Sequence, residues 1–148
     1  MRKNSVYPNA YARIRGGEEA PGISGKVEFY QTPKGVLVVA RIFGLPKNSE
    51  TGFFAFHIHE GFDCGGGGFL KTGSHYNPKN QIHPKHSGDL PPLLSCDGEA
   101  YMSVLTNRFN VREIIGRTVV IHDADDDYTT QPAGNAGTKI ACGIIRIG

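Results

Sequence analysis

The chain has 148 residues, a formal net charge of +2 and 39% hydrophobic residues. This length predicts one domain covering residues 1–148, and the near-neutral charge gives no support for a nucleic-acid or membrane-surface partner. Twenty glycines, nine prolines and no tryptophan favour turns and short strands over long helices.

The first 17 residues, MRKNSVYPNAYARIRGG, contain basic side chains but no apolar stretch of the kind that a signal peptide needs. No other run approaches the length of a transmembrane helix. We therefore expect either a cytoplasmic protein or the mature form of an exported protein whose leader is missing from this sequence.

Alternating apolar and polar residues predict seven strands separated by turn sequences. The sequence T-P-K-G at 32–35 is a strong hairpin signal between the second strand and the third. The predicted strands cover residues 9–15, 26–31, 36–43, 53–59, 100–105, 117–122 and 139–147, with a further short strand at 88–90. This pattern fits an all-β fold, a Greek-key antiparallel β-sandwich or flattened barrel of about eight strands with a long loop after the fourth.

The strand predicted at 53–59 ends in the alternating sequence His57-Ile58-His59. Residues two apart on a strand point to the same face, so both imidazoles would aim at one spot while Ile58 points into the core. Imidazole suits copper and zinc alike. An isolated H-x-H sequence is nevertheless more often an ordinary pair of polar residues than a metal site.

A second group of ligand-type residues lies in the loop sequence that follows. It consists of His75, His83, His86 and Asp89, which fall within 15 residues. Three neutral imidazoles and one carboxylate form a closed four-coordinate set of the kind used by structural zinc sites. A plain polar loop would not explain why so long a segment rich in glycine and proline is kept in a compact domain. The sequence therefore favours a metal site here.

Five motifs in order along the chain resemble the copper/zinc superoxide dismutase family. They are FHIHE, GSHYNP, HSGDL, VVIHDADD and GNAGTKIACGII, and they run from about Phe53 to the C-terminus. The resemblance implies an oxidoreductase that converts superoxide to dioxygen and hydrogen peroxide, with copper cycling between two oxidation states beside a structural zinc. Cys64 follows His59 by only five residues, which resembles bacterial members and makes the dimer mode of animal enzymes unsafe to assume. A homodimer of some kind remains an expectation.

The resemblance also implies roles for single residues. The implied copper ligands are His57, His59, His75 and His122, and the implied zinc ligands are His75, His83, His86 and Asp89, so His75 would bridge the two metals. Asp126 matches the carboxylate that hydrogen-bonds one ligand histidine of each metal and thereby sets ring orientation. Cys64 and Cys142 match the family's disulfide, although three cysteines alone allow three single bridges.

Superoxide is an anion, so a cation near copper should attract and orient it. The family pattern G-N-A-G-x-R places arginine there, whereas this chain has Lys139. Lysine keeps the charge but lacks the planar fork of donors, so we expect activity at a reduced rate. Cys96 has no counterpart in the family; a small buried thiol is the commoner outcome, and an exposed thiol that pairs between molecules is the alternative.

The alternative function is a copper- and zinc-binding module, a metal buffer or delivery protein without useful turnover. All four copper positions are filled, and a non-redox binder has no need of an open redox-metal site beside zinc. The sequence therefore favours the enzyme over the binding module. Metal content measured together with turnover separates the two.

Overall fold

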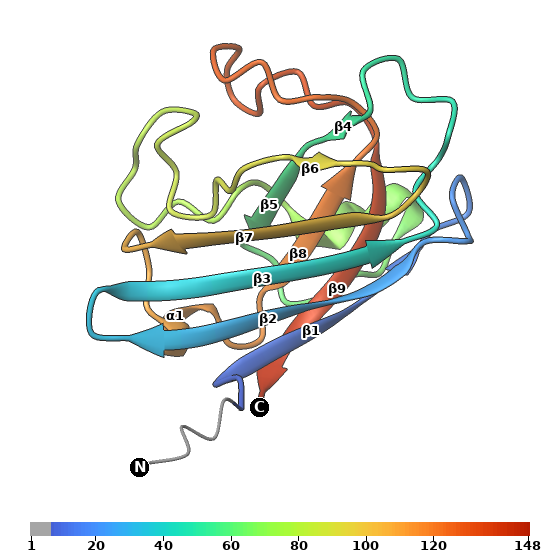
Figure 1. The fold of residues 1–148 in the computed structure, drawn as a ribbon. Coiled ribbons are helices and arrows are strands. Elements are labelled where there is room, and N and C mark those ends of the chain that lie inside the picture. Colours follow the sequence, from blue (N-terminus) through green and yellow to red (C-terminus); the bar gives the residue numbers. More distant parts are fainter. Residues whose placement is uncertain (1–6) are drawn as a thin grey trace.

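A computed structural model describes residues 7–148, and nine strands form within that range (Figure 1). The longer strands are β1 (Ala10–Gly16), β2 (Ser24–Thr32), β3 (Gly35–Phe43), β7 (Ala100–Thr106), β8 (Thr118–His122) and β9 (Lys139–Ile147). The shorter ones are β4 (Phe53–Phe54), β5 (Phe56–His59) and β6 (Leu93–Leu94), and the helical elements are η1 (Gly67–Thr72) and α1 (Val111–Ile114). The all-β prediction is confirmed. None of the helices in the described range has the length and apolar character needed to cross a bilayer.

Seven strands form one antiparallel sheet in the order β5-β8-β9-β1-β2-β3-β7. The sheet curls, so that β1, β2, β3 and β7 form a layer in front of β5, β8 and β9 (Figure 1). The first and last strands pair with each other, so Asn9 lies beside the last residue, and the N–H of Gly148 donates to the carbonyl of Asn9 (3.0 Å). The remaining two strands, β4 and β6, form a separate antiparallel pair.

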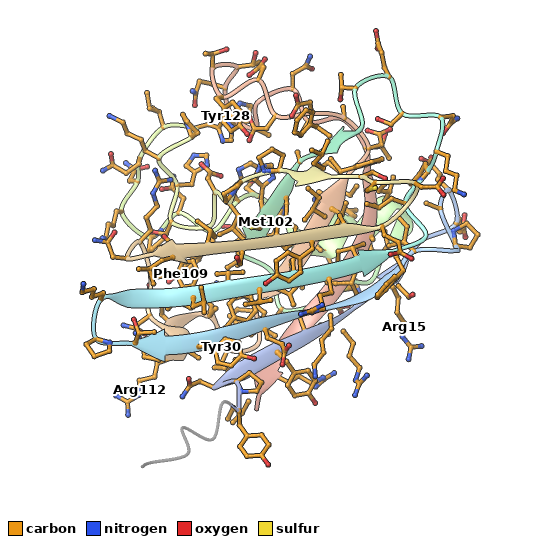
Figure 2. The ribbon with its side chains drawn as sticks, in the orientation of Figure 1. Arg15, Tyr30, Met102, Phe109, Arg112 and Tyr128 are labelled. Carbon is orange, nitrogen blue, oxygen red and sulfur yellow. A yellow bond between two sulfur atoms is a disulfide. The ribbon has the colours of Figure 1, made fainter. Side chains whose placement is uncertain are left out.

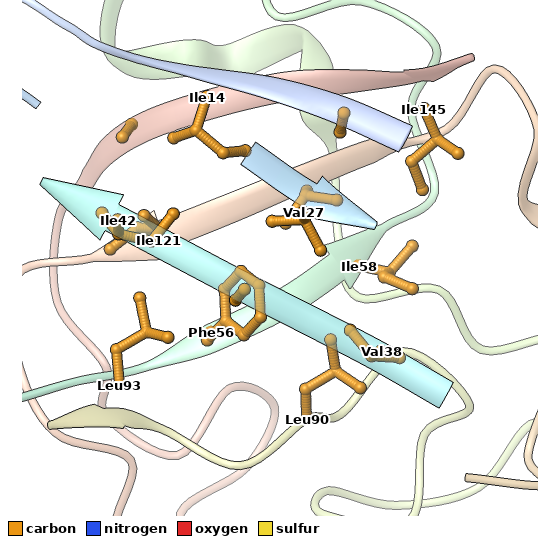
Figure 3. Close-up of a cluster of buried hydrophobic side chains, with 14 of the residues drawn as sticks. Ile14, Val27, Val38, Ile42, Phe56, Ile58, Leu90, Leu93, Ile121 and Ile145 are labelled. Carbon is orange, nitrogen blue, oxygen red and sulfur yellow. The ribbon is translucent and has the colours of Figure 1, made fainter. Parts of the chain in front are cut away.

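The core lies between these two layers. In β3, buried Val38 and Ile42 alternate with exposed Arg41 and Phe43, because successive side chains of a strand point to opposite faces. Figure 3 shows the apolar side chains of the front layer facing those of the layer behind, among them Ile14, Val27, Val38, Ile42, Phe56, Ile58, Ile121 and Ile145. The inward residues of β5 and β8 thus fix the orientation of their outward neighbours.

Two predicted strands differ from the structure. The strand at 53–59 is split at Ala55, since β4 pairs with β6 whereas β5 pairs with β8. The short strand predicted at 88–90 does not form, and only an isolated β-bridge between Asp89 and His57 of β5 is present there. The backbone N–H of Asp89 donates to the carbonyl of His86 (3.1 Å), so the segment folds as a turn, and the additional strand is β6, further along the chain.

Candidate metal centre

Three histidines extend outward from two paired strands. His57 and His59 alternate on β5, and His122 is the last residue of β8. The intervening Ile58 packs in the core, as the alternation predicts. All three imidazoles are buried, at 0%, 2% and 3% exposed respectively, so other segments of the chain cover the outer face of these strands.

His75 joins these three histidines to form the first donor group. Candidate ligand atoms of His57, His59, His75 and His122 all lie within 4.8 Å of one another. The Nε2 atoms of His59 and His122 are 3.3 Å apart. His59 Nδ1 donates to the carbonyl of Gly73 (2.9 Å) and His122 Nδ1 donates to that of Gly137 (3.3 Å). The two facing Nε2 atoms therefore both present lone pairs, an arrangement that a cation between them would make favourable.

The second donor group lies in the loop between β5 and β6. It brings together His75, His83, His86 and Asp89, as predicted from the sequence. Asp89 Oδ1 is 2.8 Å from His75 Nδ1, and its Oδ2 is 3.1 Å from His83 Nδ1 and 3.2 Å from His86 Nδ1. Three ring nitrogens around one carboxylate match a closed zinc site.

Several buried ring nitrogens have no hydrogen-bond partner. They are His57 Nδ1, His75 Nε2 and His83 Nδ1, the last of which lies near Asp89 without the geometry of a hydrogen bond. Buried polar atoms are normally paired, because leaving one unpaired costs about 1–3 kcal/mol. Each of these atoms belongs to a residue of the two donor groups, and since His75 Nδ1 lies beside Asp89 in the second group, its unpartnered Nε2 is left for the first. The residues present therefore fit two adjacent metal ions that share the His75 imidazole.

Asp126 connects the two groups. Its Oδ2 accepts from His57 Nε2 (2.9 Å) and its Oδ1 accepts from His83 Nε2 (2.7 Å). Burial acts to raise the pKa of Asp126, but the hydrogen bonds from His57 and His83 outweigh it and hold the pKa well below its usual range. Because the Nε2–H of each ring donates to this carboxylate, the Nδ1 of each ring carries the lone pair that can bind a metal ion. His57, His83 and Asp126 also lie close enough together to resemble a third metal site, but their short distances reflect these two hydrogen bonds.

Burial sets the protonation state of the histidines. Desolvation lowers the pKa of four of them, namely His57, His59, His86 and His122, and that of His122 falls to about 3. At neutral pH these rings are uncharged, which is the form that binds a metal ion. The centre is thus ready for metal without first losing protons from these side chains.

Lys139 begins β9 beside the first donor group. Its Nζ donates to Thr72 Oγ1 (2.8 Å) and to the carbonyl of Gly73 (2.9 Å), the same carbonyl that accepts from His59. Burial lowers the pKa of Lys139 from its usual value. An ammonium has three N–H donors, so two are engaged by the protein and one is left for an anion.

Three contacts at the centre were not predicted from the sequence. The side-chain amide of Gln131 accepts from the backbone N–H of His83 (2.8 Å) and donates to its carbonyl (2.7 Å). The Arg108 guanidinium donates to the carbonyls of Pro84 (2.6 Å) and His86 (3.2 Å), and Thr72 accepts from Lys139 as described above. In each contact the two partners are far apart in sequence, by 22 to 67 residues, and they follow no periodic pattern, so the sequence carried no signal for these contacts.

The cysteines divide into a pair and a free thiol. Cys64 and Cys142 form a disulfide that ties the segment before η1 to β9, as the family resemblance implied. Cys96 is free and exposed, so the expectation of a buried thiol was wrong. It lies between β6 and β7, at a tight turn that its N–H and carbonyl close with Glu99.

Comparisons with known proteins agree with this geometry. Residues 23–145 match the family model for copper/zinc superoxide dismutase. A superoxide dismutase [Cu-Zn] 2 from Aquifex aeolicus is 37% identical over 139 residues, covering 84% of this chain and 80% of the relative. A superoxide dismutase [Cu-Zn] from Legionella pneumophila is 37% identical over 134 residues, covering 85% of this chain and 80% of the relative.

A solved structure gives the same picture of the fold. The crystal structure of a double mutant of a superoxide dismutase-like protein from Bacillus subtilis superposes with a TM-score of 0.78 at 27% identity, covering 97% of this chain and all of that one. Fold and site together define a metalloprotein built on a curled antiparallel sheet, with two adjoining donor groups that share one imidazole. The chain belongs to the copper/zinc superoxide dismutase family.

Proposed function

We propose that residues 1–148 form one enzyme domain that disproportionates superoxide. Two superoxide anions and two protons give one dioxygen and one hydrogen peroxide. The proposed copper ligands are His57, His59, His75 and His122, and the proposed zinc ligands are His75, His83, His86 and Asp89. The observation that carries the proposal is the sharing of His75 between two donor groups whose unpartnered nitrogens are buried. When bound, copper supplies one-electron redox chemistry and zinc supplies a fixed charge that orders the loop.

The residues of the chain have separate tasks in this reaction. Lys139 attracts the anion and orients it with its remaining N–H, next to His59 and His122. His75 Nε2 would hold a proton whenever it does not hold copper and would return it to the reaction, while its Nδ1 stays in the group around Asp89. Asp126 keeps the rings of His57 and His83 in one tautomer throughout, because its carboxylate accepts from the Nε2 of both.

The second candidate function, metal buffering or delivery, makes a different prediction. A buffer needs the ligands but has no use for a cation held beside them, whereas Lys139 is fixed by two hydrogen bonds at that position. This favours turnover of an anion over metal storage. The chemistry requires only superoxide and protons, so the proposal includes neither nucleic acid nor a membrane as a reaction partner.

The test compares protein loaded with copper and zinc against protein loaded with zinc only. We expect superoxide decay to accelerate only in the copper-loaded sample, and His122→Ala to abolish it while zinc content stays near one ion per chain. Stoichiometric copper binding without faster superoxide decay would replace the enzyme with the metal-handling module.

The proposal extends to the oligomeric state of the protein and to the compartment in which it works. We propose a homodimer that works either in the cytoplasm or, after removal of a leader, outside it. Sedimentation equilibrium of the metal-loaded protein tests the dimer, and fractionation of cells that make it tests the compartment. A monomer at all accessible concentrations would contradict the first proposal and leave the reaction unaffected.

A further inference from the structure

The outer face of the front layer carries a row of like charges. Arg13 on β1 is paired with Lys26 on β2, and Lys26 is paired with Arg41 on β3. All three side chains are exposed. Neighbouring strands are about 4.8 Å apart, and like charges directly opposite each other destabilise a sheet. The row therefore opposes folding stability, so folding alone does not account for it.

Two more cations widen this row into a surface. Arg15 follows Arg13 on the same side of β1, and Arg146 on β9 is paired with Tyr11 of β1. Figure 2 shows the Arg15 side chain extending away from the sheet. We call the set formed by Arg13, Arg15, Lys26, Arg41 and Arg146 the basic face. It spans four adjacent strands, so it extends in two dimensions.

Little negative charge balances the basic face. Glu28 is the only carboxylate in the sequences of β1, β2, β3, β7 and β9, and its Oε2 lies 3.7 Å from Lys26 Nζ. The net charge of +2 for the whole chain conceals this separation, because the acidic residues lie almost entirely in loops.

Aromatic rings hold several of these cations in place. Arg13 and Lys26 both lie over the Tyr11 ring, at 5.9 and 5.6 Å from its centroid, and Arg41 lies 4.8 Å from that of Tyr101. These contacts stabilise each cation without neutralising it. They also cover ring faces that unpaired nucleic-acid bases would need for stacking, which disfavours single-stranded nucleic acid as the partner.

We propose that the basic face binds the surface of an anionic lipid bilayer. A bilayer presents negative headgroups in two dimensions, which matches cations spread over four strands. Phe43 and Tyr101, 48% and 60% exposed, lie on the outer side of β3 and β7 next to these cations. The amphipathic ring of a tyrosine favours the headgroup region of a membrane, and the apolar ring of an exposed phenylalanine can insert at its boundary with the acyl chains. Charge and exposed rings thus point to the same partner.

The metal centre lies on the other side of the molecule. Its strand-borne ligands project outward from β5 and β8, and the core separates these strands from β1, β2 and β3 (Figures 1 and 3). A protein bound through the basic face would keep the centre open to water. We therefore expect superoxide turnover to be unchanged on the membrane.

Co-sedimentation with vesicles tests the proposal on the metal-loaded protein. We expect binding to phosphatidylcholine vesicles that contain phosphatidylglycerol, none to phosphatidylcholine alone, and release at about 1 M salt, where the Debye length is about 3 Å. Near an anionic surface each Lys or Arg contributes about fivefold in partitioning. Combining Arg13→Gln, Lys26→Gln and Arg41→Gln should lower partitioning about 100-fold.

A matched control separates the basic face from net charge. Combining Lys34→Gln, Lys79→Gln and Arg112→Gln changes the net charge equally at exposed positions outside the basic face, and it should leave partitioning within about fivefold of the original. Thermal unfolding checks the fold: the relief of like-charge repulsion offsets the loss of the cation–π contacts and of the Lys26–Glu28 pair, so the melting temperature should stay close to that of the original. The proposal fails if the original protein does not bind anionic vesicles at low salt, or if it binds a single-stranded oligonucleotide instead. It also fails if both triple variants lose vesicle binding equally.

Discussion

The two halves of the metal centre are built in different ways. His57, His59 and His122 stand on paired strands, and the alternation of each strand, anchored by core residues, fixes their direction. The second donor group lies in a loop, where side chains from distant segments hold its backbone, as Gln131 does at His83. A strand-borne ligand is thus placed by the fold, whereas a loop-borne ligand depends on a few individual contacts. Substitutions and changes of pH should therefore affect the strand-borne ligands and the loop-borne ligands to different extents.

The largest expected effect is acid destabilisation of the metal-free protein. Burial lowers the folded-state pKa of His122 to about 3, so the unfolded chain binds a proton more readily between about pH 6.5 and that value. Stability is full above the unfolded pKa and falls as the pH drops through this range, by about 4 kcal/mol from His122 alone. Asp89, whose pKa is also lowered, adds to the loss at the acidic end.

Urea unfolding of the metal-free protein at a series of pH values measures this. Because the strand-borne histidines are part of the main sheet, we expect the circular dichroism of the strands to be lost in the same transition. A stability that stays level from about pH 7 to pH 4 would show that these rings are already accessible to protons.

Asp126→Ala should have the next largest effect, because it removes a hydrogen bond from each half at once. Losing such an outer contact costs about 10- to 100-fold in metal affinity. We expect the full loss for zinc, whose ligand His83 stands in a loop, and a smaller loss for copper, because β5 still directs His57. Competition with chelators measures both affinities, with exposed Asp97→Ala as the control. Equal losses for the two metals would break the distinction between strand-borne and loop-borne ligands.

Gln131→Met should affect the loop half only. It removes both hydrogen bonds to the backbone of His83 and keeps a similar side-chain length. We expect zinc affinity to fall about tenfold and copper affinity to stay unchanged. The visible spectrum of cobalt bound in place of zinc should shift as the ligand geometry relaxes. The control is Gln81→Met, the same substitution at an exposed position of the loop between β5 and β6 that carries His83.

Lys139→Arg should have the smallest effect. Two of the three N–H donors of Lys139 are engaged by Thr72 and Gly73, and a guanidinium offers five donors. One additional hydrogen bond to the anion is worth about 0.5–1.5 kcal/mol, which predicts about a two- to tenfold faster reaction. Steady-state rates at matched copper content measure it. An unchanged rate would show that the positive charge alone determines capture of the anion.

The strand-borne half of the centre was the easier one to predict. A period of two placed His57 and His59 on one face, and that interpretation is confirmed by the burial of Ile58 on the other. The donor types around Asp89 pointed to the second group, while the family resemblance supplied the bridging histidine and the disulfide. All of these depend on local spacing or on motifs within the sequence.

What was missed depends on contacts between distant segments. Gln131 and His83 are 48 residues apart, and nothing in either segment predicts that they meet. The strand expected at 88–90 is limited to one bridge, between Asp89 and His57, because the turn at His86–Asp89 brings the Asp89 carboxylate to the ligands and its local hydrogen bonds replace further pairing. The basic face was hidden for a similar reason, since its cations meet only when β1, β2 and β3 pair.

The peptide group of Gly73 links substrate capture to metal geometry. Its one carbonyl accepts from both His59 and Lys139, so any movement of that oxygen would displace a metal ligand and the anion-binding cation together. Gly73 has φ 68° and ψ −146°, a conformation that side chains disfavour, and an added Cβ would lie 2.9 Å from Glu60 Oε1. A substitution at position 139 alters one side chain, whereas a side chain at position 73 would disturb the one oxygen that holds both His59 and Lys139.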